Sequence, residues 1–247
     1  MSRLAVVTGG ASGIGLGVAR QLVADGHRVA ILDRDGPAAE TAAGELQEEG
    51  AKAIAVEADI ADRSSVGAAF ERVRAELGPV EILVTSAGIE SFDPLLDITP
   101  EQWDRIIAVN LTGTFTCVQA AVPDMLAAGW GRIVTIASSS ALSGAPRMTH
   151  YAASKGGVIS LTKALAVELA RSGIMANSIA PTVVDTPMAR EATARGDFPG
   201  VDVVAPMIPV GRAGTPADIA AACSYLCSEA ASYVTGQVLC VSGGMYI

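Results

Sequence analysis

The chain has 247 residues, and half of them are hydrophobic, which is enough for one large domain with a buried core. This apolar content excludes disorder as the main state. Asp and Glu outnumber Lys and Arg by 26 to 17, and the net charge of −9 argues against a nucleic-acid partner, because phosphate binding needs a basic face. No apolar stretch reaches the roughly 18 residues of a membrane span. No signal peptide precedes the first apolar run, and the four cysteines lack metal-ligand spacing. We therefore expect a cytoplasmic protein with neither a metal nor a membrane partner.

Short runs rich in Val, Ile and Leu alternate along the chain with longer Ala-rich stretches. Continuous apolar character is typical of strands buried on both faces, which predicts strands over residues 4–8, 27–33, 51–59, 80–88, 131–138, 174–181 and 236–243. Helices are expected near 13–25, 37–49, 64–77, 101–128, 150–172 and 216–228. This alternation predicts an α/β fold of about seven parallel strands covered by helices on both sides. We expect three layers, α/β/α, in a single domain over residues 1–247.

One long connection, residues 187–212, interrupts this regular alternation. It contains four prolines and three glycines. Long connections of this kind commonly carry function, so we expect a flap over an active site.

The first predicted strand ends in a glycine-rich segment, TGGASGIG (8–15), and a helix follows at once. Gly9, Gly13 and Gly15 would allow a tight turn and let backbone N–H groups approach a pyrophosphate, which the helix N-terminus also attracts. A flexible turn in a chain with 26 glycines is the plain alternative. The strand–loop–helix context favours a dinucleotide cradle.

An acidic residue, Asp33, ends the second predicted strand 18 residues after Gly15. A carboxylate at this place would accept hydrogen bonds from the adenosine ribose hydroxyls and repel the extra phosphate of NADP. NAD(H) is therefore favoured. NADP(H) stays an alternative, because Arg34 could meet that phosphate, although a solvated arginine is the plainer interpretation.

The segment YAASK (151–155) places Tyr151 and Lys155 at i and i+4 near the start of a predicted helix, on one face. A phenol alone has a pKa of about 10, but an adjacent ammonium favours the phenolate and lowers that pKa. Tyr151 could then exchange a proton with an alcohol or carbonyl oxygen.

Further polar residues accompany this pair. Ser138 ends the fifth predicted strand, 13 residues before Tyr151, at the sheet edge where α/β proteins bind ligands. Asn110 lies within the predicted helix 101–128, where its amide competes for backbone hydrogen bonds, and a solvated position is the alternative. His150 adjoins Tyr151, and because adjacent helix positions face different directions, we expect it at the pocket rim or the surface.

These motifs, in this order, resemble those of the short-chain dehydrogenase/reductase family from Leu4 to the C-terminus. The resemblance implies a Rossmann-like, doubly wound sheet and hydride transfer between a nicotinamide ring and a carbonyl or carbinol carbon. By the resemblance, Tyr151 is the acid/base, and Lys155 lowers its pKa and binds the nicotinamide ribose. Ser138 would orient the substrate oxygen, and Asn110 would hold a water that links Lys155 to solvent.

The resemblance also assigns a set of residues to the cofactor, with Asp59 at the adenine and Thr186 at the carboxamide. The full set is Gly9, Ser12, Gly13, Ile14, Gly15, Asp33, Arg34, Asp59, Ile60, Ser86, Ala87, Gly88, Tyr151, Lys155, Pro181, Val184 and Thr186. Two positions depart from the family pattern. Ser86 replaces an asparagine, and Thr182 replaces the glycine that usually follows the proline of the sixth strand.

The segments expected to form the substrate pocket are mostly apolar and carry no cluster of Arg or Lys to clamp an anion. The candidate substrate contacts are Ser140, Met148, Thr149, Val183 and Met188. They indicate a neutral, fairly hydrophobic secondary alcohol or ketone. Within the family, the chain resembles NAD-dependent secondary alcohol dehydrogenases.

The alternative substrate is a 3-oxoacyl thioester of acyl carrier protein or coenzyme A. Reductases of that kind commonly carry basic residues before the fifth strand and after the active-site helix, whereas this chain has only Arg171 there. A cofactor-binding protein without activity is a further alternative, which the intact Tyr–Lys pair disfavours. Family resemblance also implies a homotetramer built through helices 101–128 and 150–172.

Overall fold

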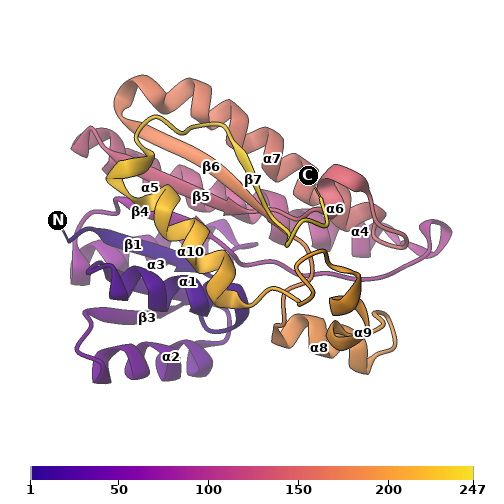
Figure 1. Ribbon diagram of the computed structural model, residues 1–247. Coiled ribbons are helices and arrows are strands. Elements are labelled where there is room, and N and C mark those ends of the chain that lie inside the picture. Colours follow the sequence, from indigo (N-terminus) through magenta and orange to yellow (C-terminus); the bar gives the residue numbers. More distant parts are fainter. Residues whose placement is uncertain (1, 247) are drawn as a thin grey trace.

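The computed structural model describes residues 2–246, and one seven-stranded sheet runs through its centre (Figure 1). The strand order is β3-β2-β1-β4-β5-β6-β7, and every neighbouring pair is parallel. The strands are β1 (Leu4–Thr8), β2 (Arg28–Asp33), β3 (Ala53–Glu57), β4 (Ile82–Thr85), β5 (Gly131–Ile136), β6 (Ile174–Pro181) and β7 (Val238–Val241). Each lies within a predicted run, so the α/β class and the doubly wound parallel sheet are confirmed.

Helices cover both faces of this sheet. They are α1 (Gly13–Ala24), α2 (Gly36–Glu48), α3 (Arg63–Leu77), α4 (Pro100–Ile107), α5 (Thr114–Ala128), α6 (Ser140–Ser143), α7 (Thr149–Leu169), α8 (Pro187–Ala194), α9 (Val201–Val204) and α10 (Pro216–Cys227). One apolar core joins the sheet to α3, α5 and α7, and a second joins it to α1, α2 and α10. The predicted three-layer arrangement is therefore present.

Strand β1 is buried on both faces, which explains why nearly all its residues are apolar. Leu4 and Val6 belong to the core shared with α3, α5 and α7, whereas Ala5 and Val7 belong to the core shared with α1, α2 and α10. Successive strand residues point to opposite faces, so a strand covered on both sides needs apolar residues throughout.

The predicted helix 101–128 is interrupted in the structure by a π-helical turn, η2 (Ala108–Gly113), between α4 and α5. A capping box between Thr99 and Gln102 begins α4, and Gly129 ends α5 in the left-handed conformation. The whole stretch Pro100–Ala128 is long and apolar enough for a membrane span, contrary to our expectation from the sequence. Half of its most apolar window is buried, and core helices of soluble proteins pass the same test.

The chain winds outward in opposite directions from the centre of the sheet. The segment from β1 to β3 builds one half, and the segment from β4 to β7 builds the other. Loops that leave the carboxyl ends of β1 and β4 therefore diverge, which opens a crevice at this edge. The segment 187–212, with α8 and α9, lies beside the main layers (Figure 1).

Phe70 of α3 is fully buried in one of the two cores, so Phe70→Ala should leave a cavity. We expect a loss of about 3–5 kcal/mol in the free energy of unfolding, measured by urea denaturation. Leu96 is 94% exposed, so Leu96→Ala is the control and should change stability by less than about 0.5 kcal/mol. Equal effects of the two substitutions would contradict this account of the core.

Candidate active site

A cavity of about 820 Å³ opens at the carboxyl ends of the strands. Loops that follow β1 to β6 form much of its wall, and the segment 187–212 and the C-terminal residues Met245 and Tyr246 complete it. All the residues assigned to the cofactor from the sequence line this cavity. Their individual contacts with a cofactor stay predictions.

The glycine-rich loop after β1 is shaped by two close backbone approaches. Gly9 has a φ of +64°, and a Cβ there would lie 2.7 Å from the Cα of Ala87. A Cβ on Gly15 would lie 2.0 Å from the carbonyl oxygen of Gly9. The Ser12 side chain makes no capping hydrogen bond to α1. The first N–H groups of α1 therefore remain available to an anion, which fits a pyrophosphate.

Asp33 lies at the end of β2, directly beside this loop. Its Oδ2 accepts a hydrogen bond from the backbone N–H of Ala11 at 3.1 Å, and its Oδ1 accepts one from Asp35 at 3.1 Å. These bonds fix the orientation of the carboxylate on the cavity wall and leave lone pairs that can accept further hydrogen bonds. The position fits the ribose hydroxyls of an adenosine.

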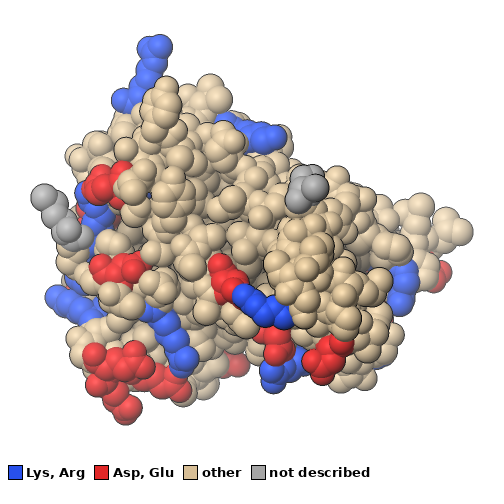
Figure 2. All heavy atoms as spheres, viewed as in Figure 1, with Lys and Arg blue, Asp and Glu red and all other residues tan. Residues whose placement is uncertain are grey.

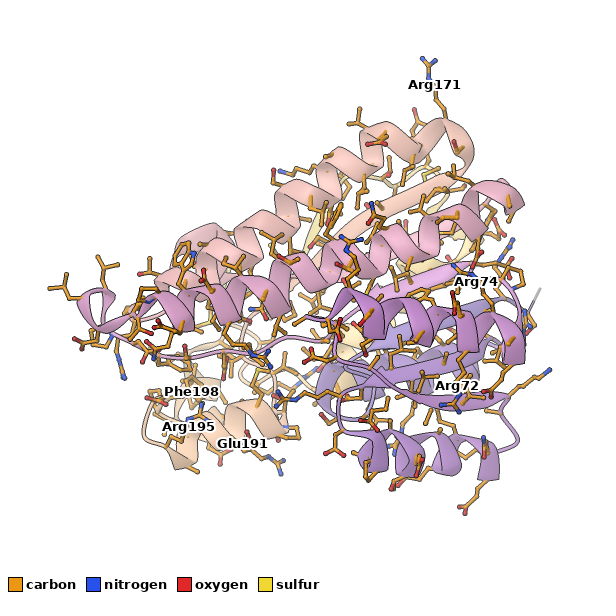
Figure 3. All side chains as sticks on the ribbon, turned by 180° about the vertical axis from the view of Figure 1, so that it is seen from behind. Arg72, Arg74, Arg171, Glu191, Arg195 and Phe198 are labelled. Carbon is orange, nitrogen blue, oxygen red and sulfur yellow. The ribbon has the colours of Figure 1, made fainter. Side chains whose placement is uncertain are left out.

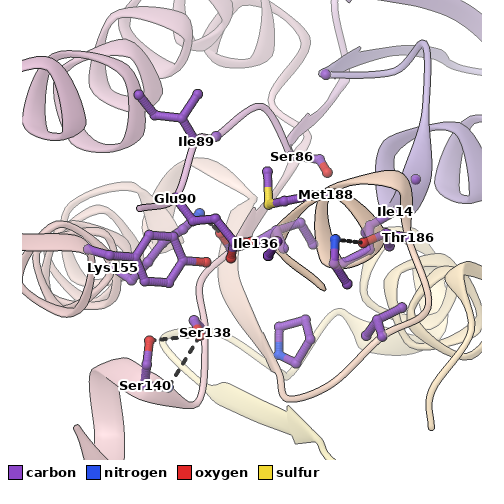
Figure 4. A pocket seen from close by; sticks show the side chains of 18 of the residues that line it. Ile14, Ser86, Ile89, Glu90, Ile136, Ser138, Ser140, Lys155, Thr186 and Met188 are labelled. Atoms are coloured by element: carbon purple, nitrogen blue, oxygen red, sulfur yellow. Dashed lines mark hydrogen bonds between the residues drawn. The ribbon is translucent and has the colours of Figure 1, made fainter. Parts of the chain in front are cut away.

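Tyr151 and Lys155 come from the first turns of α7, and Ser138 follows β5; all three line the cavity. The Lys155 Nζ donates to the backbone oxygen of Ile136 at 2.8 Å and lies 5.8 Å from the centre of the Tyr151 ring. The hydroxyl of Ser138 accepts a hydrogen bond from the Ser140 hydroxyl at 2.9 Å (Figure 4). The sequence-predicted reactive groups are thus brought together at one wall.

Burial dominates the acid–base properties of this group. It raises the pKa of Tyr151 above its ordinary value; the negative charge of Glu90 adds to the rise, and a hydrogen bond with Ser138 opposes it. Burial also lowers the pKa of Lys155 to about 8, against the opposing influence of Glu90. We predicted that the ammonium of Lys155 lowers the Tyr151 pKa; instead, burial and the charge of Glu90 raise it. Tyr151 is therefore protonated at neutral pH and can donate to a carbonyl oxygen.

Asn110 lies in the π-helical turn and is fully buried, not solvated. Its Oδ1 accepts a hydrogen bond from the N–H of Ile89 at 2.9 Å, and its Nδ2 donates to the oxygen of Ile89 and to Ser154, both at 3.0 Å. The side chain is absent from the cavity wall. It holds the chain segment after β4 in place, and its expected role in holding a water stays a prediction.

Two expectations about the substrate half need correction. Ser140, Met148, Val183 and Met188 line the cavity as expected, but Thr149 is exposed and lies outside it. The first turn of α7 directs Tyr151 inward, and Thr149, two residues earlier, points elsewhere. His150 is fully buried, not at the rim or surface, and its Nε2 lies 2.6 Å from the hydroxyl of Ser91.

Four charged residues on the cavity wall were not predicted as site residues: Glu90, Arg105, Arg147 and Asp197. The Arg147 guanidinium donates to the backbone oxygen of Phe92 at 2.6 Å and to Asp197 at 3.2 Å, and Asp197 also pairs with Arg195 at 3.1 Å. The only sequence signal for Glu90 was its position in the turn after β4. Asp197 belongs to the segment 187–212, so these bonds join that segment to the loop before α7.

A dinucleotide cradle that opens onto a protonated tyrosine is the arrangement of nicotinamide-dependent oxidoreductases that act on CH–OH groups. Comparisons with known proteins agree. A family model described as enoyl-(acyl carrier protein) reductase matches residues 9–246. The chain belongs to the short-chain dehydrogenase/reductase family.

Individual relatives cover nearly the whole chain. The 3-oxoacyl-(acyl-carrier-protein) reductase MabA of Mycobacterium tuberculosis is 39% identical over 245 residues, which are 99% of this chain and 93% of that protein. The D-threitol dehydrogenase of Mycolicibacterium smegmatis has the same identity of 39%, covering 99% of this chain and 93% of that protein. The crystal structure of 3-ketoacyl-(acyl-carrier-protein) reductase from Brucella melitensis complexed with NADH is similar with a TM-score of 0.91 and 36% identity, over 99% and 98% of the two chains.

Lys155 is buried with a pKa lowered to about 8, so its charge costs stability in the folded protein. Below pH 8 the amine is protonated in both the folded and the unfolded state, so the folded state bears the full cost of the buried charge. Between pH 8 and about 10.4 the amine is protonated only in the unfolded state, so this cost to stability decreases as the pH rises. Lys155→Met should therefore raise the free energy of unfolding at pH 7 by about 1–3 kcal/mol, and the gain should shrink as the pH rises.

Urea denaturation at several pH values measures this difference. Lys163→Met, at an exposed position of the same helix, is the control and should show no such pH dependence. A gain in stability that stays constant from pH 7 to pH 10 would contradict the assigned cost of the buried charge.

Proposed function

We propose that the protein interconverts a neutral secondary alcohol and the corresponding ketone, with Tyr151 as the acid/base. The observation that carries this proposal is the position of Tyr151 and Ser138 on a cavity wall that is otherwise mostly apolar. Side chains from several elements contribute to that apolar wall: Ile89, Phe92, Val109, Met148, Val183, Met188 and Phe198. Such a wall favours an uncharged substrate.

The reaction needs a hydride, which a bound nicotinamide supplies or accepts at the carbinol carbon. The hydroxyl groups of Tyr151 and Ser138 donate hydrogen bonds to the carbonyl oxygen and polarise it. Tyr151 then gives its proton to that oxygen during reduction and recovers it during oxidation. The neighbouring ammonium of Lys155 stabilises the phenolate that forms.

We propose NAD(H) as the preferred cofactor because Asp33 presents a fixed carboxylate at the ribose position. Asp33→Ser removes the charge that would repel the extra phosphate of NADP(H). We expect the ratio of kcat/KM for NADPH over NADH to rise at least tenfold, measured by cofactor oxidation with one saturating ketone. Asp35→Ser, which removes an exposed neighbouring carboxylate, is the control and should leave the ratio unchanged. An unaltered ratio in Asp33→Ser would exclude this residue as the basis of selection.

A 3-oxoacyl thioester is the second candidate substrate, and the comparisons favour it over a free ketone. MabA and the Brucella melitensis relative are both named as reductases of acyl carrier protein substrates. The position of Arg171 favours a small molecule over a carrier protein. Figure 3 places Arg171 at the opposite end of the molecule from Arg195 and Phe198, and Figure 2 shows Lys and Arg interspersed with Asp and Glu on the face in view.

A paired assay decides between the candidates. The rate of NADH oxidation is measured with an aryl methyl ketone and with an acetoacetyl thioester of coenzyme A, at equal concentrations. A faster reaction of the ketone supports a free alcohol or ketone as the substrate. A faster reaction of the thioester would contradict that proposal and make the protein an acyl thioester reductase.

Tyr151→Phe removes the proton donor in either case and should lower kcat by about 10²–10⁴-fold. Ser232→Ala is the control: it also removes a hydroxyl, but at an exposed position 81 residues after Tyr151 in the sequence, and it should leave kcat unchanged. Near wild-type turnover by Tyr151→Phe would show that Tyr151 is not the acid/base.

We also propose that the protein acts in the cytoplasm as a homotetramer, with residues 187–212 as the flap over the substrate. Exposed apolar side chains on α4, α5 and α7 support an assembly through these helices: Trp103 is 41% exposed, Phe115 39% and Val167 85%. The contact of Asp197 with Arg147 supports the flap, because it links this segment to the rim of the cavity.

A further inference from the structure

The segment that follows β4 carries a carboxylate into the active-site cavity. Glu90 lies on the cavity wall, on the same side as Lys155 (Figure 4). Apolar side chains make up most of the substrate half of that wall, and Glu90 is one of the few charged groups among them, of the kind that orients a ligand in such a pocket.

Two neighbours hold the backbone immediately before Glu90. Asn110 binds both the N–H and the oxygen of Ile89, the residue immediately before it. On the other side of Ile89, Gly88 passes so close to the amine of Lys155 that an added Cβ would lie 3.3 Å from Nζ. These contacts fix the backbone immediately before Glu90, whose side chain lies on the cavity wall.

The charges around Glu90 show which half of the cavity it faces. The charges that influence the pKa of its carboxyl are those of Arg195 and Asp197, in the segment 187–212, and of Lys155, in the reactive group. Burial raises its pKa, and Asp197 adds to the rise, while Arg195 and Lys155 oppose it. Glu90 thus stands between the reactive group and the flap, where a substrate would bind.

We propose that Glu90 is a specificity residue: its carboxylate accepts a hydrogen bond from a hydroxyl on the carbon next to the substrate carbonyl and repels substrates that carry a carboxylate there. This inference rests on the proposed function and narrows it to neutral hydroxy ketones and the diols related to them. A hydrogen bond to a charged acceptor in a mostly apolar site is among the stronger ones, and an anion placed beside Glu90 would meet a like charge at low dielectric.

Three aryl ketones of similar size test the proposal. Phenacyl alcohol carries the hydroxyl, propiophenone carries a methyl group in its place, and benzoylformate carries a carboxylate. For the wild type with NADH, kcat/KM should be at least about tenfold higher for phenacyl alcohol than for propiophenone, and lowest for benzoylformate. Glu90→Leu should remove the preference for the hydroxyl, and Glu90→Gln should keep part of it while accepting benzoylformate better than the wild type does.

Glu191→Gln is the matched control, because Glu191 is an exposed carboxylate of α8 that does not line the cavity. It should keep the wild-type order of the three ketones. An unchanged order in Glu90→Gln and Glu90→Leu, with activity retained, would overturn the role of Glu90 and leave the proposed function intact.

Absence of turnover of all three ketones by the wild type would count against the proposed function instead. Calorimetric binding of the three compounds to the NADH-loaded protein then tests Glu90 separately. Equal affinities for phenacyl alcohol and propiophenone in the wild type would overturn its role.

Discussion

A buried ammonium group is the constraint around which the active site is arranged. Lys155 is almost fully buried, and burial lowers its pKa to about 8. A charge in such a place needs partners, and the backbone oxygen of Ile136, at the end of β5, supplies one. The carboxyl end of β5, the first turns of α7 and the segment after β4 therefore meet at one amine. The same convergence brings Tyr151 and Ser138 together.

Much of the fold was predictable from the sequence because its signals are local. A strand covered on both faces has to be apolar at every position, as β1 is, and seven such runs separated by helical stretches leave few topologies open. The dinucleotide cradle was predictable for a similar reason. Gly15 is required by a close contact with the backbone of Gly9 in the same loop, and Gly9 has a positive φ, so most of this pattern lies in a few consecutive residues.

The remaining features depend on contacts between segments that are distant in the sequence, and no local sequence pattern predicts them. His150 was expected at the pocket rim or the surface but is fully buried. Its ring forms a hydrogen bond with Ser91, which lies 59 residues earlier in the sequence. The predicted direction of the Tyr151 pKa shift was wrong because burial, which raises this pKa most, is a property of the whole fold. Glu90 is a single acidic residue in a turn, and only the folded structure shows that it lines the cavity.

The π-helical turn between α4 and α5 has a consequence for how this chain can vary in length. A π turn holds one residue more than a regular helical turn, and one residue corresponds to about 100° of rotation around the helix axis. Deleting a residue from Ala108–Gly113 would join α4 and α5 as a regular helix but turn their faces out of phase. Asn110 would leave Ile89, or Gly113 would lose its close fit against Ile60. A change in length within this turn would therefore disturb the active-site edge of the sheet through Asn110 as well as the helix itself.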